Sequence, residues 1–380
     1  MRTPSTRLLL AALLLAPAVA SAQGTLSVLG FGYPGGQMST RSLGAGGALG
    51  EIDPLSVSNP ASILSFGGSA LYFQAEPEYR TLKSGNQSER TSIARYPLIA
   101  ASIPITQSIM LGLSVSNLLD RSFETRSRGT QQIGDSLLAT SNSFKSDGAI
   151  GDLRLALAWA PLPWMHLGAA AHAISGDNRV RNVQVFDDST RFASLIDTAT
   201  VGYTGNAYSA GVEVLAGKYV SLAASYRKGG PLSLKRGDTT LANAHVPDRV
   251  GFSAAFIGIR GTTIAARTSK DSWSNMQQLG SSSLKITDNW DTSVGADVLG
   301  PRLGERLIQL RAGARWRTLP FGLPASSVDE KSYSIGAGTL LARGRAAFDI
   351  AGIRATRTAA TASNISESAW TLSVGITVRP

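Results

Sequence analysis

Apolar and polar residues alternate with a period of two along most of this chain, which is the spacing of side chains on the two faces of a β-strand. Near the C-terminus, Trp370, Leu372 and Val374 share one face of such a segment, and Thr371 and Ser373 share the other. On nearly every segment of this kind the apolar face is free of charged residues. The pattern therefore predicts many strands that each turn one face toward an apolar medium.

Fourteen such segments occur, and most have about ten residues, the length that a tilted strand needs to cross a bilayer. They lie near 69–79, 91–103, 108–117, 149–160, 164–174, 206–215, 218–227, 249–258, 261–270, 290–299, 307–317, 332–341, 344–356 and 367–379. Short connections alternate with long ones, as on the two sides of an outer-membrane barrel. We therefore predict an all-β fold: a transmembrane antiparallel β-barrel of about 14 strands over residues 68–380, with its short turns and both termini in the periplasm.

The apolar faces also carry aromatic residues near one end of the predicted barrel. These residues are Tyr208, Tyr226, Trp290, Trp316, Tyr333 and Trp370. Tyrosine and tryptophan gather at membrane–water interfaces, so the group predicts an aromatic girdle. A soluble periplasmic β-sandwich or propeller also has alternating strands. Neither alternative accounts for the girdle, or for faces on which one charge would cost about 2–4 kcal/mol at mid-membrane.

The first 22 residues have the three parts of a secretory signal peptide. Arg2 and Arg7 give a positive start, and an unbroken apolar run follows from Leu8 to Leu15. Residues 20–22 read ASA, which fits a cleavage site. We predict that residues 1–22 are removed and that the protein works outside the cytoplasm. Export disfavours nucleic-acid binding even with a net charge of +10, and the chain offers no Cys and only three His for a metal site. We therefore expect no nucleic-acid partner, no cofactor and no metal.

Residues 23–67 are rich in Gly, contain prolines and show no sustained alternation, so they cannot form a wall strand over most of their length. They also hold apolar residues, among them Phe31, Tyr33 and Phe66, which a disordered periplasmic tail would not need. A barrel of fourteen strands encloses a lumen wide enough to need filling. We therefore predict that residues 23–67 form a hatch, or plug, inside the lumen.

Two motifs in the predicted hatch carry a family resemblance. Residues 42–50 read SLGAGGALG, and residues 59–61 read NPA. Together with weaker matches at 247–251 and 290–292, they resemble the FadL/OmpP1 (TodX) family of outer-membrane transporters for hydrophobic compounds. The resemblance implies a fourteen-stranded barrel with an N-terminal hatch. It also implies hatch and gating roles for a set of residues: Gly44, Gly46, Gly47, Asn59, Pro60 and Ala61.

The candidate ligand contacts come from two regions. The two longest predicted loops, 118–148 and 175–205, offer Phe123, Phe186 and Phe192 for capture of a hydrophobic ligand. Inside the predicted barrel, Arg311, Arg315 and Arg317 could meet an anionic head group such as a carboxylate. A salt-bridge network is the alternative, because the predicted inward faces carry charges of both signs: Asp152, Arg154, Glu213, Arg227, Asp291, Asp297, Arg311, Arg315, Arg317, Arg345 and Asp349.

These inferences predict passive transport of hydrophobic small molecules, long-chain fatty-acid-like, through a hatch-gated barrel in the outer membrane of a Gram-negative-type bacterium. The expected partners are the hydrophobic ligand, outer-membrane lipid with lipopolysaccharide, and the barrel-assembly machinery, and we expect a monomer. A surface scaffold or secretion-shuttle barrel that binds exported proteins is the alternative, since a related PorV-like branch shares the signature. We expect no enzyme, because the G-x-S-x-G elbow of a hydrolase is absent. A lumen hydrolase that uses His172 or His245 is the third hypothesis.

Overall fold

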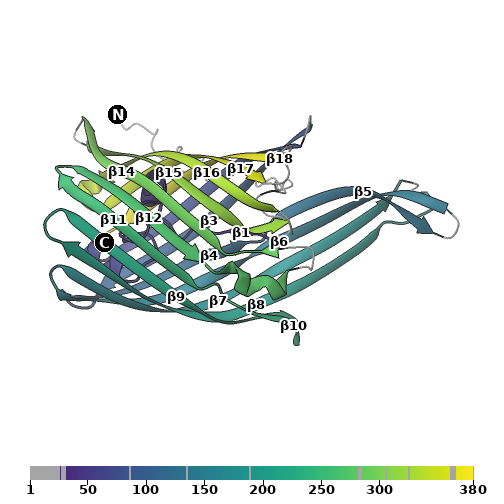
Figure 1. The fold of residues 1–380 in the computed structure, drawn as a ribbon, viewed down its shortest axis with the longest axis horizontal. Helices are drawn as coiled ribbons and strands as arrows, with labels where there is room; N and C mark the ends of the chain where they lie inside the picture. Colours follow the sequence, from purple (N-terminus) through teal and green to yellow (C-terminus); the bar gives the residue numbers. More distant parts are fainter. Residues whose placement is uncertain are drawn as a thin grey trace, which may run out of the picture.

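The chain forms an antiparallel β-barrel with a sheet of long hairpins projecting from one end (Figure 1). The computed structural model describes residues 26, 31–84, 87–133, 136–187, 190–280, 285–304, 306–323, 326–359 and 365–379, so the predicted signal peptide, 1–22, lies outside the described residues. The strands are β1 (Tyr33–Pro34), β2 (Ala70–Ser84), β3 (Gln87–Pro104), β4 (Ile109–Asp120), β5 (Phe123–Ile133), β6 (Ser136–Leu162), β7 (Met165–Phe186), β8 (Leu195–Ala216), β9 (Val220–Arg236), β10 (Thr239–His245), β11 (Arg249–Ile259), β12 (Thr262–Asp271), β13 (Lys285–Ile286), β14 (Asn289–Leu303), β15 (Arg306–Leu323), β16 (Ser326–Leu341), β17 (Ala346–Ala359) and β18 (Ile365–Val378). The helices are α3 (Thr40–Gly44) and the 3-10 turns η1 (Ala61–Phe66), η2 (Trp273–Leu279) and η3 (Ala342–Gly344).

The wall closes where the last strand, β18, pairs with the first wall strand, β2. Fourteen strands make this closed ring, and each predicted segment overlaps one of them in order, so the predicted barrel is confirmed. The wall strands are β2, β3, β4, β6, β7, β8, β9, β11, β12, β14, β15, β16, β17 and β18. Closure satisfies the backbone groups that an open edge would leave unpaired, which is the condition for strands in lipid.

The two faces of the wall differ as the alternation predicts. On β18, Trp370 is 57% exposed and Leu372 is 41% exposed on the outer face. Ser373, on the opposite face, is fully buried in the lumen. All six predicted girdle aromatics are exposed on the outer face. The strands continue past them, however: β8 already begins at Leu195, well before Tyr208. Among the described residues no helix is long and apolar enough to cross a membrane.

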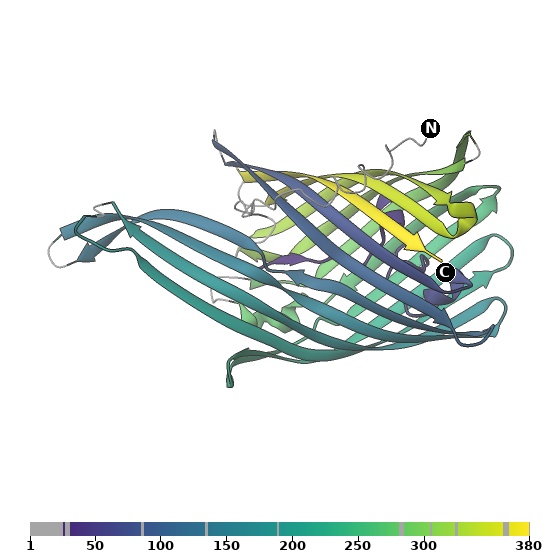
Figure 2. The ribbon, with the colours of Figure 1, turned by 180° about the vertical axis from the view of Figure 1, so that it is seen from behind.

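Two predicted loops are largely strands, which corrects the prediction of irregular capture loops at 118–148 and 175–205. β5 pairs with the first half of β6, and β7 and β8 stay paired out to Gln184 and Leu195. These strands form an arm that projects beyond the barrel (Figures 1 and 2). The alternation fails there because both faces of the arm are mostly polar, while the backbone ladder continues.

The described part of the hatch lies inside the barrel. α3 contacts β15 to β18, and η1 contacts β4 and β6 to β8 on another side of the ring. Figure 2 shows this N-terminal segment enclosed by the wall. Pairs of wall glycines permit the contact: a Cβ atom at Gly295 or Gly313 would overlap the backbone of Ala45, and one at Gly168 would overlap that of Ala61. Gly295 and Gly313 are direct partners on β14 and β15, so they form a bare patch on which the hatch backbone rests.

Gly313→Val should push the hatch off this patch, because the new side chain would occupy the space of the Ala45 backbone. Overpacking of this kind costs about 1–3 kcal/mol. We expect trypsin to cleave the folded variant after Arg41 in detergent, while the parent protein resists. Gly352→Val is the matched control, since a Cβ atom there meets nothing within 4 Å. Equal resistance of all three proteins would contradict the packing argument.

Candidate ligand passage in the lumen

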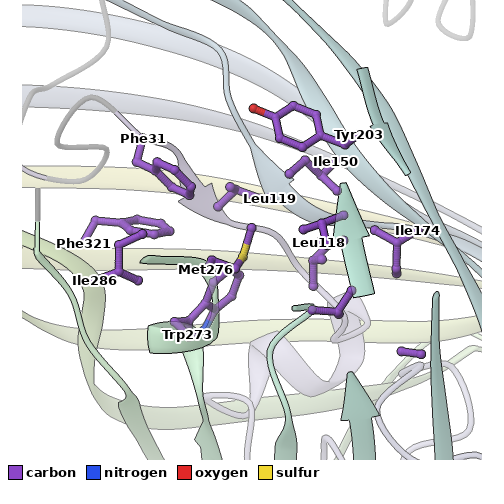
Figure 3. Packing of buried hydrophobic residues seen from close by; sticks show 13 residues of the cluster. Phe31, Leu118, Leu119, Ile150, Ile174, Tyr203, Trp273, Met276, Ile286 and Phe321 are labelled. Atoms are coloured by element: carbon purple, nitrogen blue, oxygen red, sulfur yellow. The ribbon is translucent and has the colours of Figure 1, made fainter. Parts of the chain in front are cut away.

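A cluster of buried apolar side chains lies inside the barrel on the long-hairpin side of the hatch (Figure 3). Its members come from six of the fourteen wall strands, from β13, from η2, from the residue after β10 and from the N-terminal segment. They are Phe31, Leu118, Leu119, Ile150, Ile174, Tyr203, Ala207, Leu232, Val246, Trp273, Met276, Ile286 and Phe321. Phe31 packs on Phe321 with ring centroids 4.7 Å apart, and Trp273 meets the same ring edge-on at 5.7 Å. We call this set the apolar cluster. An apolar interior in a barrel whose lumen is otherwise charged points to a hydrophobic ligand.

One arginine at the edge of the apolar cluster stands between two aromatic rings. The guanidinium carbon of Arg121 lies 4.7 Å from the ring centre of Phe31 and 5.3 Å from that of Tyr203. Its Nε and Nη1 atoms are buried and have no hydrogen-bond partner among the described residues. Most buried arginines of the lumen face a carboxylate, but no ion pair of the described residues includes Arg121. Such a cation is free to accept an anion brought by a ligand.

A ring of charges follows next along the N-terminal segment, around Tyr33. Four guanidinium groups lie 4.8–5.2 Å from the centre of its ring: Arg80, Arg95, Arg317 and Arg357. The Tyr33 hydroxyl donates to Glu330 at 3.2 Å and accepts from Arg357 at 2.9 Å and from Arg317. Cation–π contacts and hydrogen bonds therefore hold this residue from all sides. We call this set the arginine ring.

A cavity of about 120 Å³ joins the apolar cluster to the arginine ring. Leu118 and Trp273 of the apolar cluster form part of its lining, and Tyr33, Arg227 and Arg249 form another part. The space is thus apolar on one side and charged on the other. Among the described residues no group of His, Asp and Glu is placed to hold a metal ion.

The three predicted lumen arginines are all ion-paired. Arg311 lies 3.2 Å from Asp297, Arg315 lies 2.6 Å from Asp291, and Arg317 lies 2.6 Å from Glu330. These contacts fit the salt-bridge alternative. Arg315 and Arg317 also line the cavity.

Arg345 was predicted on an inward face, and that prediction is wrong. Arg345 is exposed, at the turn between η3 and β17. The predicted strand at 344–356 starts two residues too early, because Arg343 and Gly344 have the positive φ angles of a turn and β17 begins at Ala346.

The three predicted ligand phenylalanines lie in or beside the arm rather than in the apolar cluster. Phe123 stacks near Phe144 at 6.0 Å, and Phe186 near Phe192 at 5.6 Å. The structure therefore does not bring them together with the lumen arginines. Sequence reasoning missed the roles of Phe31 and Arg121, because the contact between them joins the hatch to the junction of β4 and β5.

The predicted gating residues shape the hatch and fix it to the wall. Asn59 is fully buried; its side-chain oxygen accepts from the Ala61 amide at 3.0 Å, and its amide group donates to the Glu51 carbonyl at 2.9 Å and the Val212 carbonyl at 3.3 Å. Pro60 then starts η1. Gly46 and Gly47 have φ angles of 70° and 88°, which favour glycine. A Cβ atom on Gly44 would lie 3.3 Å from the Cα atom of Gly336.

Glu51, which is fully buried, anchors the hatch to the wall by ion pairs. Its carboxylate lies 3.1 Å from Arg249 on β11 and 3.4 Å from Arg267 on β12, and it accepts from the Ser225 hydroxyl at 2.6 Å. Burial alone would raise the pKa of Glu51. The two arginines and the hydrogen bond outweigh burial and hold its pKa below the ordinary value of 4.5.

Known structures share this barrel and hatch. No protein-family model matches the chain, and no curated protein sequence matches it. A FadL homologue from Pseudomonas aeruginosa superposes with a TM-score of 0.64 at 13% identity, over 92% of this chain and 99% of that one. The chain has the fold of the FadL homologues. The toluene transporter TodX of Pseudomonas putida gives a TM-score of 0.54 at 12% identity, over 94% and 98% of the two chains. The CymD monoaromatic hydrocarbon channel gives 0.54 at 13% identity, over 91% and 98%. The FadL-type fold implied by the sequence motifs is thereby confirmed.

Glu51→Gln should loosen the hatch in a pH-dependent way. At pH 7 the change leaves Arg249 and Arg267 without one carboxylate, and removal of one partner of a buried ion pair costs about 3 kcal/mol. Because the pKa of Glu51 is lower in the folded protein than the ordinary 4.5, its contribution is complete above pH 4.5 and is lost as the pH falls toward the lowered value. Melting temperatures of both proteins should therefore differ at pH 7, and the difference should shrink as the pH falls from 4.5 through the lowered pKa. A constant difference would contradict the ionic role.

Proposed function

We propose that this protein is an outer-membrane channel that passes hydrophobic small molecules, long-chain fatty-acid-like, passively through its lumen. The observation that carries the proposal is the apolar cluster, which lies in a charged lumen on the open side of a hatch. The FadL-type fold supports it, because proteins described as a toluene transporter and a monoaromatic hydrocarbon channel share that fold. Passive transport follows from export to a compartment without ATP.

Arg121 supports a ligand with an anionic head group. Its unpartnered Nε and Nη1 atoms lie beside the apolar cluster, so an alkyl chain in the cluster would place a carboxylate within reach of the guanidinium. A charge-assisted hydrogen bond there would contribute about 1.5–3 kcal/mol. A neutral hydrocarbon would gain nothing from this residue.

The N-terminal segment 31–36 is the proposed gate. It contacts the apolar cluster through Phe31 and the arginine ring through Tyr33. It also pairs with the wall, since Pro34 faces Leu119 of β4 in the register between β1 and β4. Withdrawal of this segment would open the cavity toward the hatch.

The same segment covers a seam in the wall. Among the described residues the ladder between β3 and β4 ends at the pair Leu98–Ser116, and the rest of β3 pairs only with β2. β1 pairs with β4 at Leu119 and Asp120, just beyond that point. The proposed gate movement would therefore also uncover the seam as a second exit.

The remaining expectations follow from the same proposal. We place the chain in the outer membrane of a Gram-negative-type bacterium, with the short turns and termini toward the periplasm and the arm outside. It would be inserted by the barrel-assembly machinery as a monomer in contact with lipid and lipopolysaccharide.

A scaffold or secretion-shuttle barrel that binds exported proteins is the second candidate. The arm favours it, because it projects beyond the barrel and exposes Leu195 and Ile196, each 56% exposed. This function predicts a stable protein partner that is lost when the arm is shortened, with no uptake of small molecules.

A disulfide between β1 and β4 should stop transport. The chain has no natural Cys, and Pro34 and Leu119 are direct cross-strand partners, at a spacing that a disulfide can bridge. We expect Pro34→Cys/Leu119→Cys in proteoliposomes to take up labelled palmitate only after reduction. Oxidation should leave uptake by Ala254→Cys/Ala266→Cys unchanged, because these partners join wall strands that are already paired. Uptake by the oxidised gate variant at the parent rate would contradict the gate, and no uptake by the parent protein above empty liposomes would contradict transport.

Arg121→Gln should weaken binding of laurate about tenfold or more, because the charge-assisted bond to the carboxylate is lost. Binding of toluene should stay the same. Isothermal titration in detergent would measure both affinities. Arg128→Gln is the control, since Arg128 is exposed on the arm. Equal losses for laurate and toluene would argue against a head-group role.

A further inference from the structure

Three side chains on neighbouring wall strands form a hydrogen-bonded chain that the transport proposal does not use. The Ser209 hydroxyl on β8 lies 2.8 Å from Nε2 of His172 on β7. Nδ1 of the same imidazole lies 2.8 Å from a carboxylate oxygen of Asp152 on β6. All three side chains face the lumen and are buried, with Asp152 only 2% exposed.

The order of these contacts is that of a nucleophile, a base and an orienting acid. The Asp152 carboxylate can only accept, so the shared proton sits on Nδ1 and leaves Nε2 as the acceptor for the Ser209 proton. Arg227 lies 3.8 Å from the other Asp152 oxygen, and Gln37 of the hatch donates to it at 3.5 Å. These partners keep the carboxylate fixed behind the imidazole.

The three residues lie directly beneath the apolar cluster. In the strand registers, Asp152 faces Ile174 and His172 faces Ala207, and both of these apolar partners belong to the cluster. His172 and Ser209 are buried, with 7% and 8% of their surface exposed. An ester whose acyl chain lies in the apolar cluster with its head group turned away from Arg121, past Ala207, would therefore present its carbonyl end at Ser209.

A cation is available where negative charge would develop. Arg227 on β9 is the cross-strand partner of Ser209. Its Nε atom is buried and has no hydrogen-bond partner among the described residues, and its side chain lines the cavity. A preorganised donor without a partner is what stabilisation of an oxyanion requires.

We propose that Ser209, His172 and Asp152 form a site that hydrolyses fatty acyl esters within the lumen. Ser209 Oγ bonds to the ester carbonyl carbon while its proton passes to His172 Nε2, and Arg227 stabilises the oxyanion. Collapse of this intermediate breaks the bond to the alcohol, which leaves with the proton from His172. Water then attacks the Ser209 ester by the same route and releases the carboxylic acid. This activity goes beyond transport. It rests on the transport proposal only in placing the alkyl chain of the substrate in the apolar cluster.

A fluorophosphonate with a long alkyl chain tests the site in the full-length protein in detergent. We expect mass spectrometry to find the probe on Ser209 of the parent protein. Labelling and hydrolysis of p-nitrophenyl laurate should both be absent in Ser209→Ala and at least about 100-fold slower in His172→Ala. Ser293→Ala is the control, because Ser293 is another buried lumen serine, on β14, and its loss should leave both rates unchanged.

The outcomes are distinct from those of transport, since hydrolysis in micelles needs no passage across a bilayer. Absence of labelling in the parent protein, or equal labelling of Ser209→Ala, would overturn the proposal. Loss of the compact, heat-modifiable gel band would identify a variant that fails to fold. In that case Ser209→Thr replaces it, and retention of the parent rate by that bulkier nucleophile would also count against the site.

Discussion

In a bilayer every backbone amide and carbonyl group must find its partner within the protein, and this requirement governs the whole molecule. The wall meets it by closing β18 onto β2. Closure also separates two surfaces, one against lipid and one around a lumen, so charges excluded from the first can gather on the second. Each buried charge then needs a partner, which explains pairs such as Arg315 with Asp291. Arg121 departs from this rule, because no ion pair of the described residues includes it and two of its nitrogens have no hydrogen-bond partner there.

The hatch is held by two kinds of contact with different consequences. The hatch backbone at Ala45 contacts the wall at Gly313, and only the absence of a side chain on Gly313 permits this approach. The Glu51 carboxylate forms ion pairs with two wall arginines, Arg249 and Arg267. The glycine contact is sensitive to the volume of any side chain placed there. The Glu51 ion pairs are sensitive to pH. Together they make α3 and the residues after it a fixed part of the barrel.

The sequence predicts the wall well and the site poorly, for one physical reason. One face of each wall strand contacts lipid and must be apolar. A strand such as 367–379 therefore shows a period-two pattern that can be recognised without knowing which strands lie beside it. The arm strands are polar on both faces and lose that signal. Sites depend on register: Asp152, His172 and Ser209 meet only because β6, β7 and β8 pair with particular offsets. A search for a local serine motif could not find them, since the three residues lie far apart in the chain.

The hatch contacts differ in whether a buried charge loses its partner when the contact breaks. If Tyr33 leaves the arginine ring, Arg357 still faces Glu78 and Glu330 at 3.0 and 2.6 Å, so no buried charge is stranded. If Glu51 leaves, Arg249 and Arg267 lose a buried partner, at a much higher cost. β1 also contributes a ladder of only two residue pairs. Segment 31–36 is therefore the part of the hatch that we propose moves at least cost, and in the chain it runs from the apolar cluster toward α3. Opening by this segment alone would let a ligand pass while α3 and η1 stay on the wall.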